Sequence, residues 1–313
     1  MIAKSKFKYL PSEKFLEIKE KIIRWKKFLS YYENGSYNIK EIRKNALIAA
    51  KNIKNNTPGN VFKFSNSRLE WVRESSQNSK VNILYIHGGG FIAGSLDNHR
   101  PFAKILSKKL NANVLMVDYP LAPENKYPTQ LNEVLKSFEF MKENSSKFFF
   151  NGILGDSAGA NLGLAAILEL NKNQRLKPDF GIFLSGFFDL CLKNTSIEEN
   201  KIKDFVLTRE FLEFCVKSYS GEGKKLKKSS LSPVYGDFNS SCDLFFQVGT
   251  EEILMEDSIN CHNKAVESNV DSTLSIWPLM MHSFQSYYSC FPEADFAIRE
   301  LSAFIEKSIS KPG

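Results

Sequence analysis

The sequence lacks any run of 18 consecutive apolar residues, which excludes a helix long enough to span a membrane. Its five cysteines are odd in number and form no Cys-x-x-Cys pair, so neither a disulfide framework nor the usual spacing of a zinc site is present. The N-terminus bears Lys4, Lys6 and Lys8 with no apolar segment behind them, so no secretory signal is recognisable. These absences predict a cytoplasmic protein without a membrane span or a structural metal.

The net charge is modest for a chain of 313 residues. Lys and Arg number 42 and Asp and Glu number 35, which leaves a net charge of +7. Because bases and acids are interleaved through most of the chain, nucleic acid is not an expected partner. Apolar residues make up 42% and charged residues 25% of the chain, as in ordinary folded globular proteins.

Helix-like and strand-like patterns alternate along most of the chain. Two helical patterns come first, at residues 12–29 and 42–53. The later segments are strands at 61–64, 69–72 and 81–86, helix 101–110, strand 114–117, helix 129–142, strand 149–154, helix 158–171, strand 180–184, helix 208–218, strand 244–248, helix 256–268, strand 273–277 and helix 293–308. This order predicts an α/β fold with a mostly parallel sheet and helices on both faces, whose functional residues follow the carboxyl ends of the strands.

A Gly-x-Ser-x-Gly motif, Gly155-Asp156-Ser157-Ala158-Gly159, lies between a predicted strand and an Ala- and Leu-rich helix. The motif alone would arise by chance in about one such sequence in ten, so its position carries the argument. A sharp strand-to-helix turn exposes the serine as a nucleophile, and flanking glycines avoid collisions of Cβ atoms with the neighbouring strand and helix. Ser157 is therefore the candidate nucleophile.

The second motif, His87-Gly88-Gly89-Gly90-Phe91, also follows a strand and is far less common by chance, less than about once in a thousand sequences. Successive glycines let backbone N–H groups approach a substrate closely. The N–H of Ala158, directly after the candidate nucleophile, would add a further donor. We expect the N–H groups of Gly88, Gly89 and Ala158 to form an oxyanion hole.

Histidine is scarce, and a serine nucleophile needs a base whose pKa lies near neutral pH. The four candidates are His87, His99, His262 and His282. His87 belongs to the glycine loop, His99 opens a predicted helix and His262 lies within one, so each has a structural explanation. His282 follows the last predicted strand, as the base does in hydrolases with this type of serine turn. His282 is the predicted base.

An acid that orients the base is expected after strand 244–248. That segment offers four carboxyl groups, those of Glu251, Glu252, Glu256 and Asp257. Either Asp or Glu can hold the histidine, and spacing alone does not choose among them.

Taken together, the motifs resemble the hormone-sensitive-lipase-like family of α/β-hydrolases. The glycine motif, Asp118-Tyr-Pro-Leu-Ala-Pro-Glu124, Gly-Asp-Ser-Ala-Gly-Ala-Asn at 155–161 and His282-Ser-Phe284 follow the order of that family over residues 81–284. The family's acid segment, laid on residues 252–257, implies that Glu252 is the acid, in place of the commoner Asp. Asp257 is the alternative.

The resemblance implies an α/β-hydrolase fold and a serine carboxylesterase that hydrolyses short- to medium-chain acyl esters through an acyl-enzyme intermediate. It implies a helical cap formed by residues 1–55 and 186–235 over a catalytic core formed by 56–185 and 236–313. The expected partner is a small-molecule ester. No cofactor is implied, and a homodimer is expected.

Two other functions compete with this interpretation. Gly88, Gly90 and Ala93 fit a dinucleotide-binding pattern with Asp118 after the next strand, but the signal for the next helix, at 98–101, comes too late for the glycines to cap it. The second is a non-catalytic small-molecule receptor on the same fold, because fold does not fix function. The resemblance to plant gibberellin receptors, which lack the catalytic histidine, raises this alternative, whereas His282 is present here.

Overall fold

The computed structural model describes residues 11–28, 32–33, 36–51, 56–74, 79–172, 176–221 and 225–310. Parts of the expected N-terminal cap segment, residues 1–10, 29–31, 34–35 and 52–55, lie outside this range. One eight-stranded sheet organises the described residues, in the order β10-β9-β8-β7-β5-β6-β4-β3. Its strands are β3 (Asn60–Phe64), β4 (Ser67–Val72), β5 (Val81–Ile86), β6 (Asn113–Asp118), β7 (Phe150–Asp156), β8 (Phe180–Leu184), β9 (Asp243–Gly249) and β10 (Ser272–Trp277).

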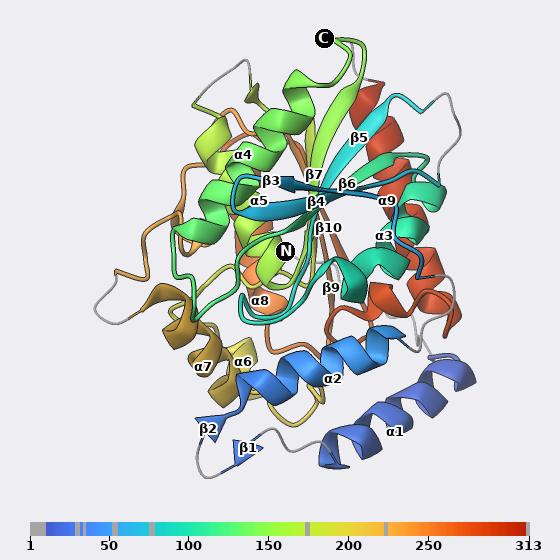
Figure 1. Ribbon diagram of the computed structural model, residues 1–313. Helices are drawn as coiled ribbons and strands as arrows, with labels where there is room; N and C mark the ends of the chain where they lie inside the picture. The colour runs from blue at the N-terminus through green and yellow to red at the C-terminus, as the bar shows by residue number, and fades with distance from the viewer. Residues whose placement is uncertain are drawn as a thin grey trace.

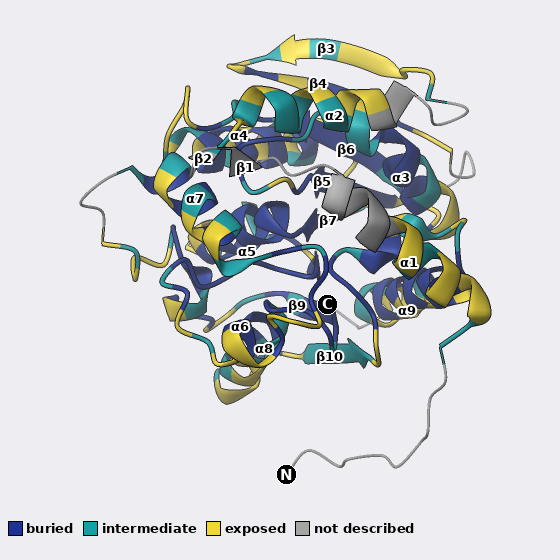
Figure 2. Ribbon diagram, turned by 90° about the horizontal axis from the view of Figure 1, so that it is seen from below, coloured by how far each residue is buried: buried dark blue, intermediate teal, exposed yellow. Residues whose placement is uncertain are grey.

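The sheet is mostly parallel, as predicted. The strands from β5 to β10 pair in parallel with their neighbours, whereas β4 pairs antiparallel with both β6 and β3. Every residue of β5 and β8 is buried, because helices cover both faces of the central strands. Figure 2 shows the same contrast, with a buried β5 and a largely exposed β3 at the sheet edge.

Helices cover the two faces of the sheet (Figure 1). Leu84 and Ile86 of β5 pack into a core with α4 (Thr129–Glu143), α5 (Ala158–Leu170) and α8 (Met255–Glu267). Ile83 and Tyr85, which point to the opposite face, pack with α3 (Leu96–Lys109) and α9 (Pro292–Ile309). Alternate side chains of one strand therefore belong to two separate cores, one on each face of the sheet.

The remaining elements gather at the end of the sheet where the parallel strands finish (Figures 1 and 2). They are α1 (Glu13–Phe28), the short strands β1 (Tyr32–Glu33) and β2 (Ser36–Tyr37), α2 (Ile39–Lys51), α6 (Ser196–Glu199) and α7 (Arg209–Ser220). Ser12 caps α1 as its position before the helix suggests, since its Oγ accepts from the N–H of Phe15 at 3.2 Å. The segment 186–235 holds one clear helix, α7, as predicted, together with the short α6.

The predicted start of the helix after the glycine loop is wrong. The helix α3 begins at Leu96, not within 98–101, because the Oγ of Ser95 accepts from the N–H of Asn98 at 3.3 Å and caps it. Pro101 therefore lies inside the helix, where it has no N–H for the carbonyl of Asp97. The Nδ2 of Asn56 donates to that carbonyl instead, at 2.9 Å.

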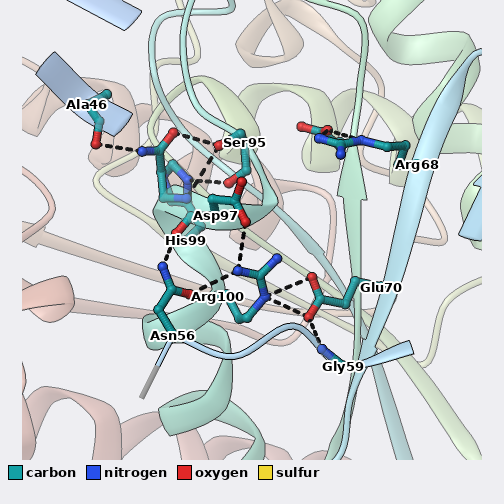
Figure 3. A network of polar contacts seen from close by, with 11 residues as sticks. Ala46, Asn56, Gly59, Arg68, Glu70, Ser95, Asp97, His99 and Arg100 are labelled. Carbon is teal, nitrogen blue, oxygen red and sulfur yellow. Dashed lines mark hydrogen bonds and ion pairs between the residues drawn. The ribbon is translucent and has the colours of Figure 1, made fainter. Parts of the chain in front are cut away.

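A buried ion pair ties α3 to β4 (Figure 3). The Nε of Arg100 donates to both carboxylate oxygens of Glu70, at 2.7 and 3.0 Å, and the two side chains are 2% and 0% exposed. Nη1 of Arg100 donates to Asn56 and Asp97, and the N–H of Gly59 donates to Glu70. Each group of the pair is thus hydrogen-bonded, which is the condition for keeping charges out of water.

Replacing Arg100 with Met should lower the free energy of unfolding by about 3–5 kcal/mol, because it leaves the Glu70 carboxylate buried without its cation. Urea denaturation followed by circular dichroism measures the change. Arg299→Met is the matched control, since Arg299 is 64% exposed where it pairs with Asp295, and it should leave the unfolding midpoint nearly unchanged. Equal losses in the two variants would contradict the importance of the buried pair.

Candidate active site

Ser157 lies on the predicted sharp turn between β7 and α5. Its backbone has φ of +53°, a strained conformation for a residue other than glycine. A Cβ atom on Gly159 would lie 2.0 Å from the carbonyl oxygen of Ile86, so only glycine allows α5 to approach β5 this closely. The Gly-x-Ser-x-Gly motif therefore adopts the strand-turn-helix geometry expected of a nucleophile turn.

His282 meets Ser157 across the ends of the sheet. The Nε2 of His282 lies 2.9 Å from the Oγ of Ser157, and its Nδ1 lies 2.9 Å from Oε2 of Glu252. Because an ionised carboxylate can only accept, the hydrogen is assigned to Nδ1, which leaves Nε2 free to accept from the serine hydroxyl. The three side chains come from the segments after β7, β9 and β10 and are all buried.

Glu252 is held by three hydrogen bonds. Besides His282, its carboxylate accepts from the N–H of Gly249 at 2.6 Å and from the Oγ of Ser185 at 2.8 Å. Its side chain is fully buried, so its negative charge acts on His282 with little screening. Burial by itself would lower the pKa of His282, but the hydrogen bond and the charge of Glu252 raise that pKa above the usual 6.5.

The other carboxyl groups of the acid segment have different partners. Asp257 accepts from the N–H groups of Phe188 and Asp189, at 2.5 and 2.7 Å, and from the amide of Asn194. Burial raises the pKa of its carboxyl to about 7. None of these contacts reaches His282. Glu251 pairs with Lys19, and Glu256 bonds Thr195 and Ser196.

One predicted oxyanion donor, the N–H of Gly88, has another partner in the structure. The N–H of Gly88 donates to the Oδ1 of Asp156 at 3.1 Å, and Gly88 does not line the cavity beside Ser157. Gly89 and Gly90 both line that cavity. Among the described residues, their N–H groups and that of Ala158 have no hydrogen-bond partner. The sequence could not distinguish the three successive glycines, since only the fold brings Asp156 against the first of them.

Contacts inside the loop explain its shape. Gly89, Gly90 and Phe91 all have positive φ, at +112°, +61° and +65°. The carbonyl of Gly89 accepts from the N–H groups of Ile92 and Ala93, at 3.1 and 3.0 Å, which closes a tight turn. Glycine adopts positive φ freely, so of the three residues only Phe91 is strained, and the loop depends on contacts from outside to hold it.

His87 has structural contacts, as expected for a residue of the glycine loop, whereas His99 lies inside α3, which begins at Leu96, rather than at its start. His87 lies between the rings of His99 and Tyr119, with centroids 4.9 and 4.3 Å away, and its Nδ1 bonds the carbonyl of Gly88. Burial, with a contribution from His99, lowers the pKa of His87 to about 3, so the ring stays neutral. The Nδ1 of His262, in α8, forms a hydrogen bond with the Oγ of Ser272 at the start of β10.

A cavity of about 270 Å³ lies beside Ser157 and His282. Its walls come from helix α2, from α7 and from residues of both cores on the two faces of the sheet. They include Ile42, Phe187, Leu207, Phe211 and Leu212, and also Tyr85, Phe102, Leu184, His99 and Gln285. The lining is largely apolar, as is usual for a small-molecule site, and its polar side chains include those of Asp156, His282 and Ser283.

Within the described residues, no cluster of three or more His, Cys, Asp or Glu side chains is arranged to bind a metal ion. In the same part of the chain, no helix has the length and apolar character needed to cross a membrane.

Comparison with known proteins identifies relatives over most of the chain. The family described as alpha/beta hydrolase fold matches residues 83–286. An esterase of Acinetobacter venetianus is 33% identical over 222 residues, which cover 71% of this chain and 73% of that protein. An acetyl-hydrolase of Streptomyces hygroscopicus is 29% identical over 248 residues, covering 79% and 82% of the two chains.

Solved structures agree with this fold. A hormone-sensitive lipase from a metagenome library has a TM-score of 0.84 at 26% identity and covers 96% of this chain and 100% of its own. A structure of EstE5 soaked with p-nitrophenyl butyrate has a TM-score of 0.87 at 24% identity and the same coverage, and shows likeness of fold. The resemblance predicted from the motifs is thus confirmed. This chain belongs to the α/β-hydrolase family, among its hormone-sensitive-lipase-like members.

Proposed function

We propose that the protein is a serine carboxylesterase that works through an acyl-enzyme intermediate. The observation that carries the proposal is the hydrogen-bonded chain from Ser157 through His282 to Glu252, beside unpartnered N–H groups at the cavity wall. The names of the relatives, an esterase and an acetyl-hydrolase, support the same class of reaction.

In the first half-reaction, the Oγ of Ser157 attacks the ester carbonyl while Nε2 of His282 takes the hydroxyl proton. The carbonyl oxygen becomes an oxyanion and accepts hydrogen bonds from the N–H groups of Gly89, Gly90 and Ala158. His282 then gives its proton to the leaving alcohol as the carbon–oxygen bond breaks. Glu252 holds the ring in the required tautomer and stabilises its protonated form.

In the second half-reaction, a water molecule replaces the alcohol. His282 takes a proton from the water as its oxygen attacks the acyl carbon, and the same N–H groups hold the second oxyanion. The proton passes from His282 to the Oγ of Ser157 as the acyl–oxygen bond breaks. The acid is released, and Ser157 is regenerated without any cofactor.

The cavity limits the substrate. A volume of about 270 Å³ with mostly apolar walls suits short to medium acyl chains. We propose that residues 1–55 and 186–235 act as a cap over the catalytic core formed by 56–185 and 236–313. The support is that Ile42 of α2 and Phe211 of α7 contribute to the cavity wall.

The cellular context stays a prediction. We propose a cytoplasmic location, supported by five cysteines that are all free thiols, and a homodimer, which rests on the family resemblance. The receptor alternative is disfavoured by the complete hydrogen-bonded chain at Ser157, because a site that only binds has no need of an oriented base.

Replacing Ser157 with Ala should lower kcat by a factor of about 10⁴–10⁶, because the nucleophile is removed while the fold is kept. Hydrolysis of p-nitrophenyl esters from acetate to decanoate measures both the reaction class and the chain-length limit. Circular dichroism is the control for folding. Near-full activity in this variant would exclude Ser157 as the nucleophile.

Glu252→Gln should lower kcat by a factor of about 10²–10⁴, since the amide no longer stabilises the protonated ring and can favour the wrong tautomer. Asp257→Asn is the matched control and should keep kcat within about tenfold of the parent, because its contacts lie on the loop at Phe188 and Asp189. Steady-state kinetics on p-nitrophenyl acetate compares the two. The reverse order of effects would mean that Asp257 is the acid.

The pH dependence of kcat/KM should report the free base. Only neutral His282 can accept the serine proton, so activity is lost as the pH falls through its pKa. Because Glu252 raises that pKa, the midpoint of the acid limb should lie above 6.5, and it should move down in Glu252→Gln. A rate that stays flat down to pH 4 would contradict the role of His282.

A further inference from the structure

One arginine fastens helix α2 to the glycine loop. The Nε of Arg43 donates to the carbonyl oxygen of Ile92 at 2.7 Å, and Nη2 donates to that of Ala122 at 2.8 Å. Nη1 and Nη2 also contact the carboxylate of Glu124, each at 2.8 Å. The Arg43 side chain is 28% exposed and that of Glu124 is 59% exposed, so the guanidinium has an inner side on the two carbonyls and an outer side on Glu124.

The carbonyl at Ile92 belongs to the turn that shapes the site. The N–H of Ile92 donates to the carbonyl of Gly89, and the N–H of Ala122 donates to the carbonyl of Phe91. Arg43 therefore bonds two residues whose N–H groups hold the carbonyls of Gly89 and Phe91. A planar guanidinium with several donors in a fixed arrangement is suited to bind two such carbonyls at once.

The same helix also forms part of the cavity wall. Ile42, next to Arg43, lines the cavity beside Ser157. One turn further along, the carbonyl of Ala46 accepts from the Nδ2 of Asn98 at 2.7 Å (Figure 3), and Asn98 precedes His99, which also lines the cavity. Helix α2 is thus tied to the core at two places, and both are on segments that border the cavity.

We propose that Arg43 is a positioning residue that couples the position of helix α2 to the geometry of the glycine loop. It acts through the carbonyls of Ile92 and Ala122 and touches no reacting atom. The inference rests on the proposed esterase function, since its effect is on N–H groups that stabilise the oxyanion. Small displacements of such donors are costly, because their benefit depends on being aimed at the transition state in advance.

The test compares Arg43→Met, Arg43→Lys and the control Glu124→Gln on p-nitrophenyl acetate. The active sites of each variant are first counted by labelling to completion with a fluorophosphonate, so that kcat refers to folded enzyme. We expect kcat per titrated site to fall at least about tenfold in Arg43→Met, equivalent to about 1.4 kcal/mol. The same N–H donors serve acylation and deacylation, so the rate constants of both steps should fall together. KM should therefore change less than about threefold.

The kcat of Arg43→Lys should fall less than that of Arg43→Met, since the ammonium group keeps the positive charge but not the several donors of the planar guanidinium. Glu124→Gln should stay within about twofold of the parent, because it alters only the outer side of Arg43. A purely structural role would reduce the number of titrated sites but not kcat per site. If Arg43→Met does not fold, Arg43→Lys decides, with a fall of kcat per site of threefold or more as the supporting result.

A kcat per titrated site within about twofold of the parent in the folded Arg43 variant would overturn the inference. That result is distinct from a failure of the proposed function, in which the parent protein itself would hydrolyse none of the esters.

Discussion

The parallel pairing of four neighbouring strands is the constraint on which the site depends. Strands β7, β8, β9 and β10 lie side by side, and each is followed by a polar residue of the site, in turn Ser157, Ser185, Glu252 and His282. Parallel strands end at one edge of the sheet, so residues as much as 125 positions apart are brought within hydrogen-bond distance. The pairing fixes the backbones, and hydrogen bonds of 2.8 to 2.9 Å then align the side chains.

Two buried carboxyl groups a few residues apart show how partners set the role of a residue. Glu252 faces a histidine and two donors, and its charge favours the protonated ring that the reaction forms. Asp257 instead accepts from two backbone N–H groups and fixes the loop after β8, which contributes Phe187 to the cavity wall. In the proposed reaction, the same carboxyl chemistry thus assists a proton transfer in one place and fixes a loop conformation in the other.

The glycine loop, the proposed source of the oxyanion donors, is strained only at Phe91, and its support comes from distant parts of the chain. Tyr119 donates to the carbonyl of His87, and Arg43 reaches the far end of the turn from helix α2. The buried pair of Arg100 and Glu70 fixes the start of α3, directly after the loop. Donors that must not move during the reaction need such external bracing, because a glycine-rich segment has little stiffness of its own.

The sequence by itself determined the alternation of strands and helices and the turn at Ser157, and it favoured His282 as the predicted base, because these depend on residues within a few positions of one another and on their order along the chain. Family resemblance added Glu252. Only the tertiary structure decided which of four carboxyl groups touches His282 and that the N–H of Gly88 donates to Asp156, because both depend on contacts between segments distant in sequence, which no local pattern encodes. The prediction missed the start of α3 after Ser95 because Pro101 lies inside the helix, where Asn56, distant in sequence, donates to the carbonyl that the proline leaves without its usual partner.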